Sequence, residues 1–301
     1  MSLARFLFAA AMVGGAGGCA SDGAVADTAY SAQIAHWRQQ RLQALTAVDG
    51  WLTLVGFDWL RPGAQTVGRA PDNTIVLPVG PAHLGTITLA TDGQVRLDLA
   101  ADADATVDGE VVHSALLRDD RDARPSEVRF GTAGLFLLDR SGRKALRIKD
   151  SMATTRTDFR GLDSFPTDPS WRIEARFEVF DPVQHVELAT EAGTIERDVV
   201  PGRIVFERDG QRYTLLPILE TPSDTRLFVV FADRTSGHET YGAARFLYVD
   251  AARDGRVVLD FNRAYNPPCA FTAFATCPLP PPENRLPLRV TAGELTYRGG
   301  H

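Results

Sequence analysis

The chain has 301 residues, and 32 Lys and Arg against 38 Asp and Glu give it a formal net charge of -6 at pH 7. Hydrophobic residues make up 44% and charged residues 23%, which is typical of a folded protein rather than a disordered one. The acidic balance excludes general nucleic-acid binding, because that function needs surplus cations to neutralise phosphates. A length of this order predicts two structural units, and 26 Gly with 18 Pro favour a turn-rich chain over a helical bundle.

Residues 1–18 have the pattern of an export signal peptide, with Arg5 first, then the apolar run 6–13, then small residues up to Cys19. The apolar run is too short to cross a bilayer as a helix. Small residues directly before a cysteine are typical of a lipoprotein signal, so Cys19 is the predicted lipidation site. We therefore expect a lipoprotein on the periplasmic side of a cell envelope, attached to the membrane only by its N-terminal lipid. A soluble periplasmic protein, cleaved nearby, is the alternative.

After the signal, the small and polar residues 19–29 are predicted to form a tether. Residues 30–47 predict a helix, because Ile34, Trp37 and Leu45 recur at helical spacing. From residue 51 onward, short alternating runs separated by turn residues predict a mainly β protein.

The predicted strands fall into two units. The first unit, 30–150, contains the helix and strands at 51–57, 65–69, 73–77, 84–90, 94–99, 105–108, 110–117, 127–130, 134–139 and 144–148. The charged stretch 150–170 is the predicted junction. The second unit, 151–301, has strands at 171–180, 184–189, 194–199, 203–207, 211–218, 226–232, 243–249, 256–261 and 286–292. Asp209-Gly210 between two alternating runs predicts a two-residue hairpin turn.

Residues 66–78 (TVGRAPDNTIVLP) resemble the opening of forkhead-associated (FHA) domains, which are β-sandwiches that read phosphothreonine, and 105–109 (ATVDG) resemble a later hairpin of those domains. In that family the Arg that matches Arg69 holds the phosphate together with a Ser three residues ahead of a His. The corresponding stretch here, 81–85 (PAHLG), has no such Ser, so phosphopeptide binding is not predicted. The expected fold is a helix, then an FHA-like sandwich, then a second antiparallel β-sandwich or barrel unit.

The loop 233–246 gathers several groups able to move protons. His238, with Asp233 or Glu239, could serve acid/base catalysis. The alternative is a solvated turn, because Thr-Ser-Gly is common turn chemistry. Two further residues of this loop are predicted to bind substrate, namely Tyr241 and Arg245.

The proline-rich block 260–286 follows, and prolines fix its backbone in advance. A composite ligand site for a polar or anionic molecule is predicted here, formed by Asp260, Asn262, Arg263, Tyr265 and Asn266. The alternative is a structural plug, in which the Asn side chains satisfy buried backbone groups.

Cys269 and Cys277 form an even pair once Cys19 is set aside, which predicts a disulfide in an exported protein. Two free thiols are the alternative. No metal site is predicted, because zinc would need two further ligands and no nearby His or Cys supplies them. No cofactor is predicted either.

Three blocks, 50–60 (GWLTLVGFDWL), 240–247 (TYGAARFL) and 266–280 (NPPCAFTAFATCPLP), together resemble a bacterial and archaeal family known as domain of unknown function 1684. The resemblance covers about residues 37–295 and brings no established activity. It implies that the three blocks belong to one composite site.

Three functions of different classes remain. The leading one is an exported protein that binds a polar or anionic small molecule in the second unit. The second is a hydrolase that uses His238. The third is an envelope protein that docks a protein partner through the FHA-like unit, which would require an exposed apolar patch on residues 51–150.

Overall fold

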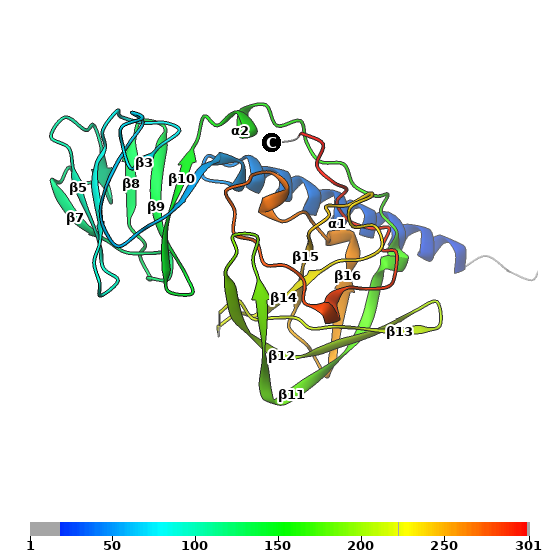
Figure 1. Ribbon diagram of the computed structural model, residues 1–301. Coiled ribbons are helices and arrows are strands. Elements are labelled where there is room, and N and C mark those ends of the chain that lie inside the picture. Colours follow the sequence, from blue (N-terminus) through cyan, green and yellow to red (C-terminus); the bar gives the residue numbers. More distant parts are fainter. Residues whose placement is uncertain (1–18, 222, 300–301) are drawn as a thin grey trace, which may run out of the picture.

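The computed structural model describes residues 19–221 and 223–299 (Figure 1). Its one long helix, α1 (Cys19–Thr46), precedes two β units, so the predicted mainly β fold is confirmed. The predicted signal peptide lies outside the described residues. The predicted tether, 19–29, is part of α1, because its several alanines favour a helix more than they favour a linker. Among the described residues, no helix is long and apolar enough to span a membrane.

The first unit is a sandwich of two five-stranded sheets. One sheet has the order β1 (Leu54–Trp59), β10 (Arg143–Asp150), β9 (Ala133–Arg140), β8 (Glu127–Phe130) and β6 (Thr106–Val107). The other has the order β3 (Ile75–Val76), β2 (Gly63–Gly68), β4 (Gly85–Leu89), β5 (Val95–Leu99) and β7 (Ser114–Leu117). Every strand predicted for this unit overlaps an observed one, although 51–57 begins as the 3-10 turn η1 (Trp51–Thr53). Alternate side chains fill the core between the sheets, among them Leu135 and Leu146 from one and Val67 and Leu97 from the other.

The second unit is a half-barrel. A four-stranded sheet has the order β13 (Gln211–Leu215), β12 (Ile195–Arg208), β11 (Arg172–Ala189) and β16 (Arg256–Asp260), and β14 (Arg226–Phe231) pairs with β15 (Arg245–Asp250). Each of the two long strands joins two predicted ones; β11 does so across a register shift between Val179 and Gln184. Short helices complete the unit and its approach, namely α2 (Thr154–Thr157), η2 (Pro169–Trp171), η3 (Phe261–Arg263), η4 (Pro268–Ala270) and η5 (Pro282–Asn284).

The predicted hairpin turn between β12 and β13 is confirmed. Arg208 pairs with Gln211, and both central residues have positive φ angles, 53° at Asp209 and 74° at Gly210. This backbone is the form that matches the twist of the flanking strands.

The predicted strand 286–292 is wrong: residues 286, 290 and 292 are buried, but the segment forms no ladder. Leu286 and Val290 belong to the core, so the alternating pattern reported burial correctly. The carbonyl oxygens of Val290 and Ala292, however, accept hydrogen bonds from the Arg245 guanidinium instead of from a neighbouring strand. The Arg245 side chain thus binds the carbonyl oxygens that would accept hydrogen bonds from a neighbouring strand in a sheet.

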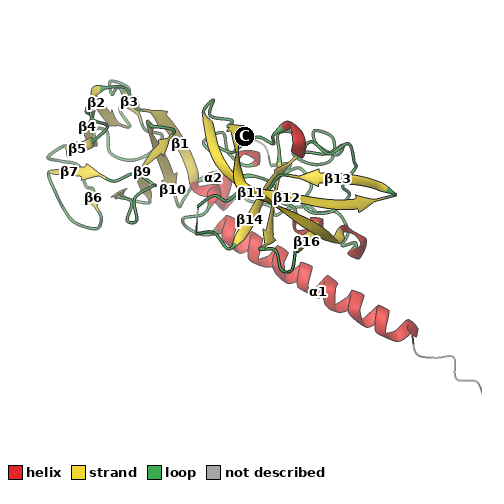
Figure 2. Cartoon of the chain, turned by 90° about the horizontal axis from the view of Figure 1, so that it is seen from below, coloured by secondary structure: helices red, strands yellow, loops and turns green. Residues whose placement is uncertain are grey.

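Helix α1 lies against the second unit, although the sandwich follows it directly in the chain (Figure 2). The Tyr30 hydroxyl donates to Asp260 Oδ1 at 2.7 Å, and Arg41 Nε lies 3.1 Å from Glu294 Oε1. Leu45 is fully buried beside Phe271 of the second unit. The helix therefore forms one wall of the space between the two β units.

Candidate functional site

A cleft with a volume of about 1240 Å³ lies where α1, the sandwich and the half-barrel meet. The helix contributes Trp37 and Arg41, and the β9–β10 turn contributes Arg140 and Ser141. Strands β12, β14 and β15 of the half-barrel form the remaining wall. The cleft is large enough for a small organic ligand, and it lies at a junction between units, where binding sites are common.

A stack of rings and guanidinium groups lines one side of this cleft. The rings of Tyr248 and Tyr265 are stacked, with centroids 6.3 Å apart and an interplanar angle of 17°. The Arg41 guanidinium lies 4.6 Å from the centre of the Tyr265 ring, and the Arg226 guanidinium lies 4.4 Å from the centre of the Tyr248 ring. Each contact is a cation–π interaction, which holds a planar cation in place. Arg41 also uses Nε to bind Glu294 and Nη2 to donate to Asn266 O.

A group of carboxylates lies next to this stack. The Tyr248 hydroxyl donates to Glu220 Oε2 at 2.6 Å, and burial, followed by this bond, raises the pKa of Tyr248. Asp198 on β12 also lines the cleft. Burial, followed by repulsion from Glu196 and Glu220, raises the pKa of Asp198 to about 6. Asp198 is therefore the cleft carboxyl best suited to take up or release a proton near neutral pH.

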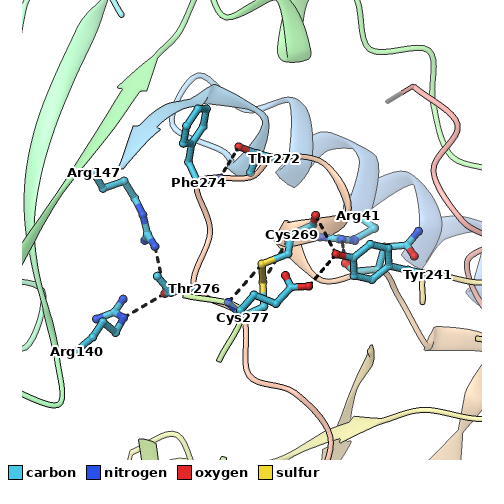
Figure 3. The surroundings of a disulfide bond; sticks show 11 residues. Arg41, Arg140, Arg147, Tyr241, Cys269, Thr272, Phe274, Thr276 and Cys277 are labelled. Carbon is cyan, nitrogen blue, oxygen red and sulfur yellow. Dashed lines mark hydrogen bonds between the residues drawn. A yellow bond between two sulfur atoms is a disulfide. The ribbon is translucent and has the colours of Figure 1, made fainter. Parts of the chain in front are cut away.

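Two arginines of the sandwich converge on one hydroxyl that lines the cleft. Arg140 Nε donates to Thr276 Oγ1 at 3.2 Å, and Arg147 Nη2 donates to the same oxygen at 3.4 Å (Figure 3). Arg140 also pairs with Asp120 at 2.7 Å and with Glu196 at 3.7 Å. These contacts join the sandwich to the proline-rich block of the second unit.

Two of the predicted site residues form a sealed ion pair away from the cleft. Arg245 Nη1 lies 2.7 Å from Asp233 Oδ2, and the two side chains are 1% and 0% exposed. Asp233 Oδ1 accepts from the amide and the hydroxyl of Thr235. Every polar atom of Asp233 is thus occupied by the protein's own donors, which is the arrangement of a structural pair.

His238 is exposed and does not line the cleft, and among the described residues its side chain forms no ion pair with Asp233 or Asp260. Its neighbour Glu239 pairs with Arg289 at 2.5 Å. The polar loop is therefore a turn whose backbone bonds to itself, with Thr235 O accepting from the amides of His238 and Glu239.

Asn262 is fully buried and bonds to the backbone on both sides of its amide. Its Oδ1 accepts from the amide of Asp168 at 3.0 Å, and its Nδ2 donates to the carbonyl of the same residue at 2.8 Å. Asp260 Oδ1 accepts from Asn262 and from Tyr30. These contacts correspond to the plug alternative, in which a side-chain amide replaces a missing strand partner.

Asn266 acts in the same way, since its Nδ2 donates to Leu295 O at 2.7 Å. Of the residues predicted in the proline-rich block, Arg263 and Tyr265 reach the cleft. Arg263 Nε lies 3.5 Å from Asp260 Oδ2, and its side chain is 41% exposed. The proline-rich block therefore combines the two predicted roles. Asn262 and Asn266 satisfy buried backbone groups, as a structural plug would, and Arg263 and Tyr265 lie at the cleft, as a ligand site requires.

The two cysteines lie at disulfide distance, with their Cα atoms 6.2 Å apart and both side chains buried. Tyr241, whose hydroxyl donates to Cys269 O at 3.2 Å and to Glu191 Oε1 at 3.0 Å, lines a second cavity of about 340 Å³ beside them. Glu191 and the two sulfurs are the group of potential metal ligands found among the described residues. Sulfurs joined to each other are not thiolates, so this group is not assigned to a metal.

The cleft residues that sequence patterns missed come from distant elements. Arg41 belongs to α1, Asp198 to β12, and Tyr248 to β15. In the sequence, Arg41 and Asp198 are indistinguishable from ordinary solvent-facing positions of an amphipathic helix or strand. Only Tyr248 could have been noticed in the sequence, because its hydroxyl-bearing ring stands between the apolar residues Leu247 and Val249 of β15.

The family described as "Protein of unknown function (DUF1684)" matches residues 157–295. The solution NMR structure of an uncharacterized protein of Haloarcula marismortui is 36% identical, over 47% of this chain and 79% of that chain, with a TM-score of 0.41. A crystal structure of Rad53 1-466 in complex with AMP-PNP shares 14% identity, over 61% of this chain and 39% of that chain, and its TM-score of 0.18 supports no inference. No curated protein matches the chain.

The chain belongs to the DUF1684 family. The match begins at residue 157, whereas the predicted resemblance began at residue 37. The family thus accounts for the half-barrel and the proline-rich block, and the sandwich with the block 50–60 lies outside the matched residues.

Proposed function

We propose that this protein is an exported lipoprotein, anchored through Cys19, that binds a polar or anionic small molecule in the cleft between its two β units. The observation that carries the proposal is the stack of Arg41, Tyr265, Tyr248 and Arg226 along one wall of a cleft of about 1240 Å³. Aromatic faces bind the apolar part of a ligand, and guanidinium groups bind its oxygens.

The charges of this wall support an anionic ligand. Within the described part of the chain, Arg226 forms no ion pair, and its recorded contact is with the Tyr248 ring. Arg263 is 41% exposed, and its one ion-pair partner among the described residues is Asp260 at 3.5 Å. Both guanidinium groups keep donors that a carboxylate or phosphate could take, since Arg carries five N–H donors.

The two alternative functions have less support from the contacts. A hydrolase that uses His238 would need that side chain at the cleft, and His238 does not line it. Docking through the FHA-like sandwich would need one exposed apolar patch. Among residues 51–150, the exposed large apolar side chains are Trp51, which lines the cleft, and Val76, Val111 and Leu116. Val76 and Leu116 lie on β3 and β7, which are the opposite edges of one sheet.

A thermal-shift screen of polar and anionic metabolites tests ligand binding, because a ligand that binds the folded state raises its Tm. The wild type is compared with Arg226→Met and with Arg256→Met, an exposed arginine on β16 that serves as the matched control. We expect hits that raise the Tm of the wild type and of the control but not of Arg226→Met. A screen without hits, or hits that are indifferent to Arg226, would refute the cleft as the binding site.

Fractionation tests export and lipid anchoring separately. The Cys19→Ser variant should lose lipid labelling and move from the membrane to the soluble periplasmic fraction. Membrane association that persists in this variant would contradict anchoring through Cys19.

A further inference from the structure

Arg147 is a buried cation without a carboxylate partner. It lies on β10 between Leu146 and Ile148, which point into the sandwich core, so Arg147 faces the second unit. Its exposed fraction is 7%. Among the described residues it forms no ion pair, its Nε has no hydrogen-bond partner, and its guanidinium reaches only Thr276 Oγ1 and the face of Trp51.

Burial of such a group has an energetic consequence. A charge taken out of water without a counter-ion destabilises the fold, and burial followed by repulsion from Arg140 lowers the pKa of Arg147 to about 10. Asp120 attracts Arg147 only over a distance, because its own contact is with Arg140. Lys149, farther along β10, adds a further positive charge, and the pKa of Lys149 is lowered in part by Arg147. The surroundings of Arg147 therefore lack one negative charge.

Thr276 indicates where that charge would sit. Its hydroxyl oxygen accepts from Arg140 and from Arg147, so its single proton is free to be donated elsewhere. Thr276 and Arg140 both line the cleft. Figure 3 shows the two arginines reaching Thr276 from one side, next to the disulfide. Two donors, from β9 and the proline-rich block, thus line the cleft, and Arg147 on β10 reaches the same hydroxyl oxygen of Thr276.

We propose that Arg140, Arg147 and Thr276 form the subsite for a phosphoryl group of the cleft ligand. A phosphoryl group offers three terminal oxygens, one for each donor, whereas a carboxylate offers two. This inference rests on the proposed function, because it places the anionic group of the same ligand. The stack of Tyr248 and Tyr265 would then hold the remainder of the molecule.

Calorimetric titration with inorganic phosphate, with acetate in a parallel titration, tests the subsite. The variants are Arg147→Met, Thr276→Val and the control Arg256→Met. We expect phosphate to bind the wild type and the control with the same Kd, more tightly than acetate. Binding should weaken at least tenfold in Arg147→Met and several-fold in Thr276→Val. The Tm of Arg147→Met without ligand should equal or exceed that of the wild type, because an apolar side chain of similar size replaces an uncompensated buried charge.

The outcomes separate this inference from the proposal on which it rests. Equal phosphate affinity of Arg147→Met and wild type, no phosphate binding, or acetate binding as tightly as phosphate, would overturn the phosphoryl subsite. If metabolites found in the thermal-shift screen still depended on Arg226 in that case, the cleft would remain a binding site and only the subsite would be wrong. A large loss of Tm in Arg147→Met would mean that Arg147 stabilises the junction between the units, which also contradicts the proposal.

Discussion

Arg245 Nη1 lies 2.7 Å from Asp233 Oδ2, in a position where neither side chain has more than 1% of its surface exposed. The same guanidinium donates to the carbonyl oxygens of Val290 and Ala292, and it lies over the Phe231 ring. One buried cation therefore connects β15, the loop after β14 and the last segment of the core. Its role is in the assembly of the half-barrel.

Arg245→Met and Asp233→Asn should each lower the free energy of unfolding by about 3–5 kcal/mol, because each leaves a buried partner without its counter-charge. Urea denaturation measures the effect. Arg212→Met is the control, since Arg212 pairs with Glu178 at 3.2 Å with 53% of its side chain exposed, and an exposed pair contributes at most about 1 kcal/mol. Losses below about 1 kcal/mol in both buried variants would show that the pair is dispensable.

Asn262→Asp and His238→Gln should behave differently. A carboxylate at position 262 would face Asp260 and the Asp168 carbonyl, and it could no longer donate to that carbonyl, so we expect a loss of about 2–4 kcal/mol. His238→Gln changes an exposed residue and should stay within about 0.5 kcal/mol of the wild type. Equal stability of the two variants would contradict the buried role of Asn262.

The raised pKa of Asp198, about 6, predicts a pH dependence of stability. Between pH 4 and 6 the unfolded chain has lost this proton and the folded chain retains it, so the free energy of unfolding falls as the pH rises through this window. Asp198→Asn removes the dependence and should be more stable than the wild type by about 1 kcal/mol at pH 8, after a discount for solvent screening. At pH 4 the two should be equal.

Urea denaturation of wild type and Asp198→Asn at both pH values measures this difference, and Asp209→Asn, in an exposed turn, is the control. A stability difference that is the same at pH 4 and pH 8 would show that the Asp198 carboxyl titrates normally.

Reduction of the Cys269–Cys277 pair should lower the free energy of unfolding by about 2–3 kcal/mol, since the crosslink closes a short loop in the unfolded chain. The double variant Cys269→Ser/Cys277→Ser should lose at least as much, because both sulfurs are buried. Denaturation of the wild type with and without dithiothreitol measures the effect, and the double variant should not respond to the reductant. An unchanged wild-type midpoint on reduction would mean that the pair contributes as packed thiols.

The strands could be predicted from the sequence because alternation and turn residues are local signals. The strand at 127–130 coincides with β8, and Asp209-Gly210 sits in the predicted hairpin. The prediction of a strand at 286–292 was wrong because an alternating pattern indicates burial but not the hydrogen-bond partner. Two carbonyl oxygens of this segment accept from Arg245, a residue far away in the chain. No periodicity in that segment could reveal such a partner.

The candidate site could be predicted only in part, for the same reason. Arg263 and Tyr265 lie at the cleft, as a rigid proline-rich block suggested. The role of Asn262 could not be predicted from the sequence, because the same residue type can hydrogen-bond to buried backbone groups or bind a ligand. The other cleft residues include Arg41, Asp198 and Arg140, which only the packing of helix and sandwich on the half-barrel brings together.

The hydrogen-bond partners of Arg245 also bear on the stage of synthesis at which the half-barrel can pack. The guanidinium takes its acceptors from Val290 and Ala292, and Gly293, at a φ of 84°, lets the chain pass so close that a Cβ there would lie 2.9 Å from Arg245 Nη2. When all the strands of the half-barrel have been synthesised, Arg245 already has its counter-charge, Asp233, but not yet the two carbonyl groups that accept its remaining hydrogen bonds. We therefore expect the half-barrel to pack fully only after residue 293 has been synthesised, so a nascent chain that lacks this segment should remain open.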